Sequence, residues 1–319
     1  MTMPRTLVIM PNWIGDFTLA LSVVSRKAAI DGADITLLVA PPLIPLCTLL
    51  CSFAVIPYKR KTKAEFRATL SAIKSGGFNT VYVLPPSFSS AWCAFRSNIP
   101  RRRGISRELR GRILTDALPG SLRGADQHLT YEYALVLETN YNPPEYWQGA
   151  AIDAPHRYAD TIVLCPESLY GPAKRWPWFK QLAQLLPGKK IVLLGGAGDE
   201  DTGESIEALA ADRIENLIGK TQLIDAAAII AAARLVISND SGLMHLAGFL
   251  GTPVVGIFGS TSPKWTRPLG KRVLCAKIKC ECSPCFKRTC KYGHYNCLKN
   301  LSAEYVASAA ENMLRGGRP

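Results

Sequence analysis

Short apolar runs alternate with longer amphipathic stretches along the whole chain. Runs such as residues 35–39, 161–165 and 234–237 are almost entirely apolar, which is typical of strands that are buried on both faces of a sheet. The stretches that follow them carry apolar residues three and four positions apart, a spacing that predicts helices. This alternation of strand and helix favours an α/β fold built on parallel sheets.

The same pattern assigns most of the chain to one kind of element or the other. Strands are predicted over residues 6–10, 35–39, 53–56, 79–84, 161–165, 191–194, 216–218, 234–237 and 253–258. Helices are predicted over residues 17–29, 43–51, 64–75, 88–96, 128–138, 176–186, 223–232, 246–250 and 302–314, and one more is expected after Asp201. Residues 101–112 are rich in arginine and are either an anion-binding segment or, as the alternative, a solvated helix.

A proline-rich stretch, residues 141–155, divides this alternation into two halves. We therefore expect two domains, residues 1–150 and 151–319, each a doubly wound, Rossmann-like sheet, with the two facing each other across a cleft. The last predicted helix belongs to the second half, although it could also pack back on the first domain. A ligand is expected at the carboxyl edges of the two sheets.

To predict the cellular compartment, we ask whether any segment could span a membrane or serve as a signal peptide. Residues 35–57 are uncharged over a length that could span a bilayer, but Pro41, Pro42 and Pro45 would break a helix there. The first apolar run is too short for a signal peptide and ends at Pro11. We therefore expect a cytoplasmic protein.

The net charge is +13, and the basic residues are clustered. Six arginines fall within residues 101–112, and residues 264–299 carry ten Lys and Arg against one acid. Such clusters are either solvated faces or binding sites for an anionic partner, such as a nucleic acid, a lipid surface or a phosphorylated substrate. No known nucleic-acid motif is present and aromatic residues are not interleaved with the basic ones, so we expect no nucleic-acid partner.

One turn between a predicted strand and a predicted helix has the residues of an anion site. Asp240 and Ser241 are good helix N-caps, and Gly242 allows a ligand to approach the backbone. A helix that begins here directs free N–H groups and a partial positive charge at the space above the sheet, which suits a phosphate. His245 lies one turn further on. The alternative is a capped helix with a histidine in the core.

Asp16 occupies the corresponding position in the first half, after the predicted strand at residues 6–10 and beside Gly15. The commoner role of an Asp at such a junction is to cap its helix. The functional interpretation is a carboxylate held at the carboxyl edge of a parallel sheet, where open α/β folds place their sites.

Three motifs in this order resemble a known family. They are Asn12-Trp13-Ile14-Gly15-Asp16, Gly171-Pro172-Ala173-Lys174-Arg175-Trp176-Pro177 and Asn239-Asp240-Ser241-Gly242-Leu243-Met244-His245. Together they look like those of the ADP-heptose:lipopolysaccharide heptosyltransferases of glycosyltransferase family 9, closest to the heptosyltransferase II type. The resemblance runs over most of the chain.

The resemblance implies a GT-B fold, with an N-terminal acceptor domain and a C-terminal nucleotide-sugar domain, and an inverting transfer that requires no metal or other cofactor. It implies that Asp16 is the general base. It implies a donor site made of Lys174, Asp240, Ser241, Gly242, Leu243 and His245. Elementary chemistry agrees, because inversion needs one base for the acceptor hydroxyl. In a metal-independent transfer, a Lys and a helix N-terminus must stabilise the leaving diphosphate.

The partners implied by the resemblance are ADP-heptose, an acceptor of the lipid A–Kdo–heptose type, and the inner membrane surface, touched from the cytoplasm. Arg101, Arg102, Arg103, Arg107 and Arg110 could bind the carboxylates and phosphates of that acceptor. One alternative is a related glycosyltransferase that uses another nucleotide sugar or core position. The other is a non-catalytic protein that binds anions or nucleic acid.

The cysteines of the C-terminal part form a separate cluster. Cys280, Cys282, Cys285, Cys290 and Cys297, with His294 among them, have the side chains of zinc ligands, although not the spacing of two clean Cys-x2-Cys pairs. A structural zinc site, a loop able to form a disulfide and a set of free thiols all remain open. We place this segment outside the active site.

Overall fold

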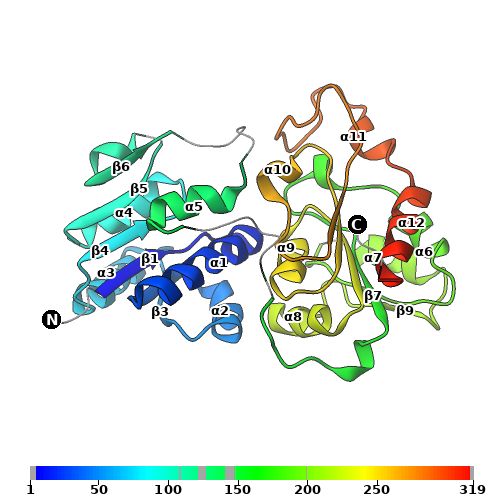
Figure 1. The fold of residues 1–319 in the computed structure, drawn as a ribbon, viewed down its shortest axis with the longest axis horizontal. Helices are drawn as coiled ribbons and strands as arrows, with labels where there is room; N and C mark the ends of the chain where they lie inside the picture. Colours follow the sequence, from blue (N-terminus) through cyan, green and yellow to red (C-terminus); the bar gives the residue numbers. More distant parts are fainter. Residues whose placement is uncertain are drawn as a thin grey trace. The chain divides into compact units, whose positions relative to one another are not determined.

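The computed structural model describes residues 5–107, 109–120, 127–140, 147, 149–198 and 200–316. The chain divides into two compact units, Met1–Pro143 and Pro144–Pro319, which Figure 1 colours from blue to green and from green to red. Each unit holds one six-stranded sheet in which every strand pair is parallel. The predicted α/β fold with two doubly wound sheets is therefore confirmed.

The sheet of the first unit has the strand order β3-β2-β1-β4-β5-β6. Its strands are β1 Arg5–Ile9, β2 Asp34–Val39, β3 Ala54–Pro57, β4 Thr80–Val83, β5 Arg101–Ser106 and β6 Asp116–Pro119. Its helices are α1 Ile14–Asp31, α2 Ile44–Leu50, α3 Lys63–Ser75, α4 Phe88–Arg96 and α5 Leu129–Leu137, with 3₁₀ turns at Pro41–Leu43 and Arg110–Arg112.

Helices lie on both faces of this sheet. On one face, α3 and α4 bury Ile73 and Cys93 against strand residues such as Leu7 and Val81. On the other face, α1 packs against α5, and α5 also contacts β4 and β5. Burial on both faces explains why β1 and β2 read as continuous apolar runs in the sequence.

Three differences from the sequence prediction concern this unit. Residues 101–106 form the strand β5, which rules out the alternative of a solvated arginine-rich helix there. The four-residue strand β6 was not predicted. Helix α1 begins at Ile14, three residues earlier than expected, so Asp16 lies inside its first turn. Of the predicted linker, residues 141–146 and 148 lie outside the described residues.

The sheet of the second unit has the order β12-β11-β10-β7-β8-β9. Its strands are β7 Thr161–Cys165, β8 Lys190–Leu193, β9 Ile214–Asn216, β10 Leu235–Asn239, β11 Val254–Ile257 and β12 Val273–Ala276. Its helices are α6 Phe179–Gln184, α7 Glu200–Glu207, α8 Leu223–Ala232, α9 Gly242–Phe249, α10 Pro263–Thr266, α11 Asn296–Lys299 and α12 Ala303–Leu314, with 3₁₀ turns at His156–Tyr158 and Pro172–Lys174.

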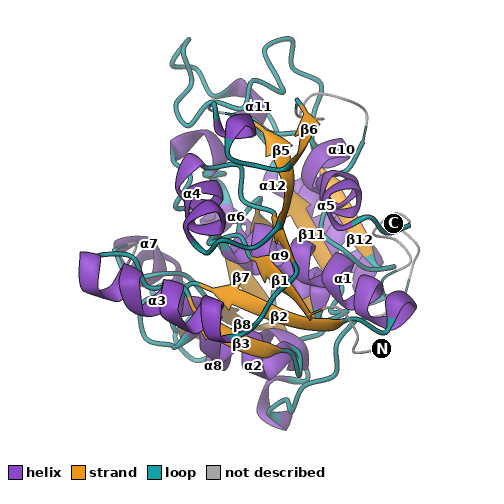
Figure 2. Ribbon diagram, turned by 90° about the vertical axis from the view of Figure 1, so that its left-hand side faces the viewer, coloured by secondary structure: helices purple, strands orange, loops and turns teal. Residues whose placement is uncertain are grey.

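Here too helices pack on the strands: α9 and α12 both contact β10 and β11. Figure 2 shows the helices in purple and the strands in orange. One face carries α6, α7 and α12, which bury Phe179, Ile206 and Val306 in a common core. The terminal helix α12 thus packs on the sheet of its own unit. Strand β12 was not predicted, and β9 begins two residues before the predicted strand.

The strand order places the switch point of each sheet. In the first unit the chain reverses direction across the sheet between β1 and β4, and in the second between β7 and β10. Ligands of doubly wound sheets bind beyond the carboxyl ends of the strands at such points. Asp16 follows β1 and Asp240 follows β10, so both candidate carboxylates lie at switch points. Within the described part of the chain, no helix is long and apolar enough to cross a membrane.

Candidate active site

The ends of β7 and β10 are held together by the side chain of Asn239, the last residue of β10. Its Oδ1 accepts a hydrogen bond of 3.0 Å from the backbone N–H of Trp176, and its Nδ2 donates to the carbonyl oxygen of Pro166. Asn239 is fully buried. The loop that follows β7, which carries Lys174, is therefore fixed against the turn that carries Asp240.

These two loops bring together the central charged pair of the second unit. Lys174 Nζ lies 2.6 Å from Asp240 Oδ2, and the two side chains are 13% and 2% exposed. The hydroxyl of Thr261, from the loop after β11, donates to the same carboxylate oxygen. His245 Nε2 lies 3.7 Å from Asp240 Oδ1. Three of the predicted donor-site residues thus form one cluster, with Thr261 as an additional member.

Asp240 is ionised in this setting. Burial by itself would raise the pKa of Asp240, but the positive charge of Lys174 and the contact with His245 outweigh burial and hold that pKa well below its ordinary value. The cluster therefore keeps a buried carboxylate and a buried ammonium in contact, and removal of either one would leave an uncompensated charge.

Helix α9 begins directly after this carboxylate. Its N-cap is Ser241, whose side chain makes no capping hydrogen bond to the helix and lies 3.1 Å from Ser238 Oγ instead. Gly242 and Leu243 form the partly exposed first turn. Because the first N–H groups of a helix have no partner within it, this turn presents donors and a partial positive charge beside Lys174 and Asp240. Asp240 is therefore not the cap that the sequence suggested.

Tyr170 holds Lys174 from another side, a role that the sequence did not predict. Lys174 Nζ lies 4.6 Å from the centre of the Tyr170 ring, within the range of a cation–π contact. The Tyr170 hydroxyl donates to the carbonyl oxygen of Phe286 at 2.7 Å. Phe286 belongs to the cysteine-rich segment, which runs from β12 to α11 as the long orange loop in Figure 1.

The cysteine-rich segment also contacts the loop of Lys174 through its backbone. Ala173 N–H donates to the Arg288 carbonyl oxygen at 3.1 Å, and the N–H groups of Cys285 and Phe286 both donate to the Ser260 carbonyl oxygen. Gly171 has a φ of +132°, and a Cβ there would meet the Arg288 carbonyl oxygen at 2.8 Å, so glycine is required. The backbone of this segment therefore frames the Lys174 loop, so the segment lies nearer the predicted donor residues than the sequence suggested.

All ten cysteines are free thiols. In the segment itself, Cys280 Sγ and Cys282 Sγ lie 3.5 Å apart. Among the described residues, no three His, Cys, Asp or Glu side chains gather where they could hold a metal ion. A structural zinc ion takes four such ligands, and a structural zinc in this segment stays a prediction.

Asp16 lies in the first turn of α1, as the third helical residue after the N-cap Trp13. It is half-buried. Burial, the charge of Asp16 and the charge of Glu132 together raise the pKa of Tyr133, a buried residue of α5. Asp16 is thus not the N-cap of its helix, and its carboxylate lies close enough to Tyr133 to influence it electrostatically.

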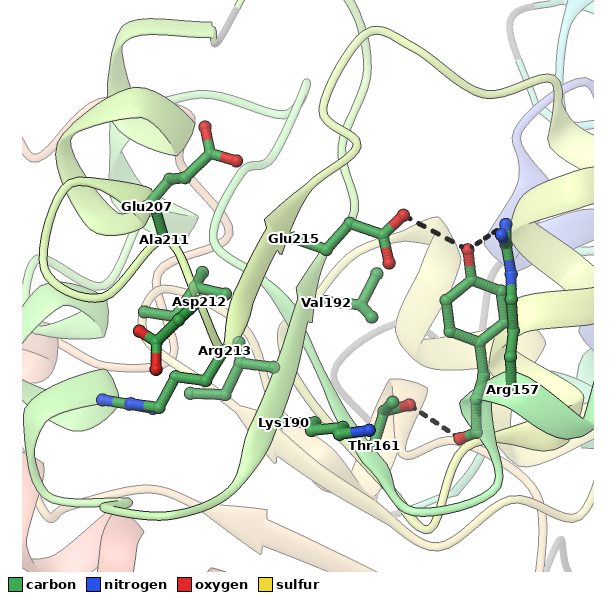
Figure 3. Close-up of a pocket in the computed structure, with 12 residues that line it drawn as sticks. Arg157, Thr161, Lys190, Val192, Glu207, Ala211, Asp212, Arg213 and Glu215 are labelled. Atoms are coloured by element: carbon green, nitrogen blue, oxygen red, sulfur yellow. Dashed lines mark hydrogen bonds between the residues drawn. The ribbon is translucent and has the colours of Figure 1, made fainter.

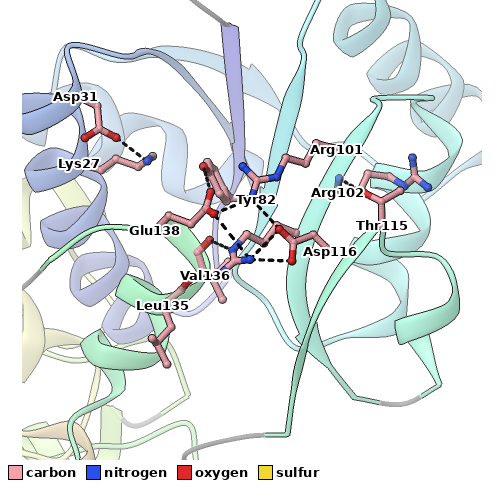
Figure 4. A network of polar contacts seen from close by, with 11 residues as sticks. Lys27, Asp31, Tyr82, Arg101, Arg102, Thr115, Asp116, Leu135, Val136 and Glu138 are labelled. Carbon is pink, nitrogen blue, oxygen red and sulfur yellow. Dashed lines mark hydrogen bonds and ion pairs between the residues drawn. The ribbon is translucent and has the colours of Figure 1, made fainter.

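Successive side chains of a strand point to opposite faces of the sheet, so the arginines of β5 fall into two groups. Arg101 and Arg103 share one face and bind the protein's own carboxylates. Figure 4 shows Arg101 beside Asp116 and Glu138. Arg101 Nη2 lies 2.7 Å from Asp116 and 2.6 Å from Glu138, and Arg103 Nη1 lies 2.7 Å from Asp116. The hydroxyl of Tyr82 donates to Glu138 at 2.8 Å. These two arginines, predicted as acceptor ligands, are already neutralised within the unit.

Two further predicted arginines are held by backbone carbonyl groups. Arg102 donates to the carbonyl oxygens of Ile99 and Ile113 at 2.7 and 3.0 Å. Arg110 is completely buried and donates to the carbonyl oxygen of Pro85. The guanidinium of Arg110 therefore supports the loop after β4 from inside the unit.

Arg107 differs from the other four. It lies just beyond the carboxyl end of β5, at the same edge of the sheet as the start of α1. Its side chain forms no hydrogen bond or ion pair with the residues that the structure describes. Of the predicted acceptor ligands, Arg107 therefore lies at the carboxyl edge of the sheet with a charge available for an anion.

We expect Asp116→Asn to lower the free energy of unfolding by roughly 1–2 kcal/mol, because its partly exposed pairs contribute less than buried ones. Hydrogen bonds from Arg103 and Arg101 lower the pKa of Asp116. A lowered carboxylate pKa adds stability above the unfolded value of about 3.9, and this stability is lost as the pH falls through and below that value. Thermal melts should therefore show a smaller acid-induced loss for Asp116→Asn than for the wild type.

The matched control is Asp34→Asn, because the Arg5–Asp34 pair is about half exposed. Its effect should stay below about 1 kcal/mol. Equal melting curves for the wild type and Asp116→Asn at every pH would show that the network contributes nothing.

The second unit also contains a cavity of about 360 Å³ at the other edge of its sheet. It lies where β7, β8 and β9 begin, and Thr161, Lys190 and Arg213 line it (Figure 3). The cations of its wall are matched by carboxylates such as Glu207 and Glu215. It contains none of the predicted site residues, and its balanced charge gives no preference for an anion.

The sequence reasoning missed two residues of the cluster, Thr261 and Tyr170. Thr261 could have been found, because residues 259–263 form a hydroxyl-rich loop directly after a predicted strand, at the same edge as Asp240. For Tyr170 the only signal was its position four residues before Lys174.

Comparison with known proteins identifies the family of this chain. The profile of glycosyltransferase family 9 (heptosyltransferase) matches residues 66–296. Lipopolysaccharide heptosyltransferase 2 of Salmonella typhimurium is 28% identical over 97% of this chain and 98% of that protein. The structure of Escherichia coli ADP-heptose LPS heptosyltransferase II superimposes with a TM-score of 0.84 at 27% identity, over 98% of this chain and 99% of that one.

An Escherichia coli heptosyltransferase solved with ADP has a TM-score of 0.74 at 21% identity, over 97% of this chain and 99% of that one, and supports the fold. The fold is the GT-B type of these neighbours. The family match covers most of the chain and includes Lys174, Asp240 and His245. On this evidence the chain is a glycosyltransferase and belongs to family 9, the heptosyltransferases.

Proposed function

We propose that this protein transfers a heptose from ADP-heptose to the inner core of lipopolysaccharide, as a heptosyltransferase of the II type. The observation that carries the proposal is the buried Lys174–Asp240 pair at the switch point of the second sheet. The substrates in this proposal are inferred from the near full-length similarity to heptosyltransferases 2.

The second unit would bind the donor. Its diphosphate would lie at the first turn of α9, where backbone N–H groups and the Lys174 ammonium can bind phosphate oxygens. Asp240 orients Lys174 before the donor arrives. Two buried polar atoms, His245 Nδ1 and Ser260 Oγ, have no hydrogen-bond partner among the described residues. Because an unsatisfied buried polar group is costly, a bound donor that supplies partners for them would be favoured.

The first unit would bind the acceptor. In an inverting transfer, Asp16 takes the proton of the acceptor hydroxyl while the oxygen bonds to the anomeric carbon, and ADP leaves from the opposite face. Negative charge develops on the departing diphosphate, and Lys174 and the α9 N-terminus stabilise it there. Arg107 is the arginine best suited to an acceptor carboxylate or phosphate. The acceptor is a lipid, so we place the reaction at the cytoplasmic face of the inner membrane.

We expect activity to survive EDTA, because Lys174 and a helix N-terminus supply the charge that a divalent ion would otherwise supply. One sequence feature favours a requirement for a divalent ion: the tripeptide Asp199-Glu200-Asp201 has the Asp-x-Asp form of divalent-ion sites. Asp199 lies outside the described residues, and Asp201 is exposed on α7. The measurement is the initial rate with and without EDTA, for the wild type and Asp201→Asn.

A rapid loss of activity in EDTA that Mg²⁺ or Mn²⁺ restores would contradict metal independence. A slow loss that only Zn²⁺ restores would instead indicate a structural zinc in residues 280–297.

The function is tested with a panel of acceptors. Purified protein is incubated with ADP-heptose and core-truncated lipopolysaccharides that carry no heptose, one heptose or two, and the products are analysed by mass spectrometry. We expect one added heptosyl unit, with equimolar ADP, on the acceptor that carries one heptose. Preference for the heptose-free acceptor would assign another core position, and turnover only with a different nucleotide sugar would assign another donor. Binding of RNA without any turnover would favour the non-catalytic alternative.

A further inference from the structure

The outer face of α4 is apolar, although a helix face in contact with water is normally polar. Phe88, Trp92 and Phe95 follow one another at helical spacing and are 44%, 37% and 40% exposed. The inner face of the same helix is filled by small residues such as Ala91 and Ala94. We call these three exposed residues the aromatic stripe. An outward-facing aromatic stripe marks an interaction surface, because a solvated helix face is normally polar.

A fourth exposed apolar residue lies beside the start of this helix. Leu109 is 87% exposed and has a φ of +62°, in the left-handed region that favours glycine. The next residue, Arg110, donates to the carbonyl oxygen of Ser87, the N-cap of α4. The loop therefore holds Leu109 next to the first turn of the helix.

The cations around the stripe are not neutralised. Arg60 donates to Ser89 on the outer side of α4 at 2.7 Å, and the guanidinium carbons of Arg96 and Arg102 lie 5.6 Å from the Trp92 and Phe95 rings. None of the three arginines forms an ion pair in the described part of the chain. Arg101 and Arg103, which point to the other side of β5, are by contrast paired with carboxylates.

The stacked rings and the unpaired arginines together favour an anionic bilayer over a nucleic acid as the partner. Neighbouring rings of the stripe are stacked on one another, at 6.3 and 5.6 Å with interplanar angles of 16° and 26°. Arginines cover further ring faces. Nucleic-acid bases stack on open aromatic faces, so a single-stranded nucleic acid fits poorly. Exposed aromatic rings flanked by Lys and Arg instead match the headgroup region of an anionic bilayer.

We propose that the aromatic stripe of α4, with Leu109 and the flanking arginines, is the surface by which this protein docks on an anionic membrane. The choice of a bilayer as the occupant rests on the proposed function, because a lipid-anchored acceptor lies in such a surface. The rings would enter the headgroup layer, and Arg60, Arg96 and Arg102 would bind lipid phosphates. Lys59, Lys61 and Lys63 extend the same positive field, and the nearby acid Glu65 is engaged in the capping box of α3.

The test is flotation of the purified full chain with vesicles of phosphatidylcholine alone and vesicles that also contain phosphatidylglycerol. We expect binding to the anionic vesicles only, weakened by salt. Trp92→Ser with Phe95→Ser should reduce the partition coefficient on the order of tenfold or more. The matched control is Ile30→Ser with Leu49→Ser, which removes two apolar residues that are at least as exposed as Trp92, elsewhere in the unit, and should bind as the wild type does.

A second pair of variants keeps the apolar surface and changes charge. Arg96→Glu should also reduce vesicle binding, whereas Arg26→Glu, an exposed arginine of α1, should not. Melting temperatures report whether each variant is folded. Unchanged binding by the folded stripe and Arg96 variants, equal binding to neutral vesicles, or retention by single-stranded RNA but not by vesicles would overturn the proposal.

Activity on an acceptor without acyl chains tests the proposed function independently of membrane binding. The stripe variants should keep that turnover while losing vesicle binding. Vesicle binding by a protein that turns over no acceptor would support the docking surface and refute the proposed function.

Discussion

Lys174→Ala is expected to destabilise the second unit and to weaken ADP binding together. The substitution leaves the Asp240 carboxylate, 2% exposed, without its ammonium partner. Loss of one partner of a buried ion pair typically costs about 3–5 kcal/mol of folding stability. The same ammonium is the proposed ligand of the donor diphosphate, and a lost charged hydrogen bond weakens binding by about 1.5–3 kcal/mol. Denaturant unfolding and calorimetric titration with ADP measure the two effects.

The double variant Lys174→Ala with Asp240→Asn separates stability from binding. Removal of both charges eliminates the uncompensated carboxylate, so part of the lost stability should return. ADP affinity should remain low, because the ammonium is still absent. Lys271→Ala, an exposed lysine of the same unit, is the control and should change neither quantity. A Lys174→Ala protein with wild-type stability and wild-type ADP affinity would remove Lys174 from the site.

The pH dependence of this cluster follows from the lowered pKa of Asp240. A carboxylate with a lowered pKa contributes stability that is present above its unfolded value of about 3.9 and is lost as the pH falls through and below that value. The acid-induced loss of stability should therefore be smaller in Lys174→Ala with Asp240→Asn than in the wild type.

The sequence predicted the fold where apolar runs and helical spacing were clear. Helices α4 and α8 and strand β7 begin and end where the pattern placed them. Strand β5 was missed because three of its six residues are arginines, and their charge hides the alternation of the strand. The pairing of Arg101 and Arg103 with Asp116, thirteen or more residues away, is what makes such a strand stable, and a linear pattern does not contain it.

The site was predictable in its type but not in its internal contacts. Position after a strand indicated Asp16 and Asp240, and the motif resemblance indicated Lys174. The direct contact of Lys174 with Asp240 depends on Asn239, which ties two strand ends together. The backbone of Arg288 against Ala173 depends on a long loop with no regular structure. Such contacts between distant segments have no periodic signal in the sequence.

Asp16→Asn is expected to leave a folded protein that binds donor and is nearly inactive. A sugar hydroxyl is far too weak an acid to ionise near neutral pH, so a base must take its proton as the glycosidic bond forms. A positioned general base typically contributes 10²–10⁴-fold, roughly 3–5 kcal/mol of barrier. Asparagine has nearly the same shape as aspartate but cannot accept that proton.

The competing role of Asp16 is favourable interaction with its helix. As a carboxylate in the first turn of α1, it interacts with the helix dipole. Loss of that interaction costs only about 0.3–1 kcal/mol of stability and does not change catalysis. Asp31→Asn, at the other end of the same helix, controls for removal of a carboxylate from α1 and should keep wild-type activity.

The most direct measurement is kcat for Asp16→Asn beside its melting temperature and its ADP affinity. Because Asp16 lies in the first unit and the proposed donor cluster in the second, we expect kcat to change while ADP affinity does not. We expect kcat to fall about a hundredfold or more while the ADP dissociation constant stays within about twofold of the wild type. A folded Asp16→Asn protein that keeps more than about a tenth of the wild-type kcat would contradict the assignment of Asp16 as the base.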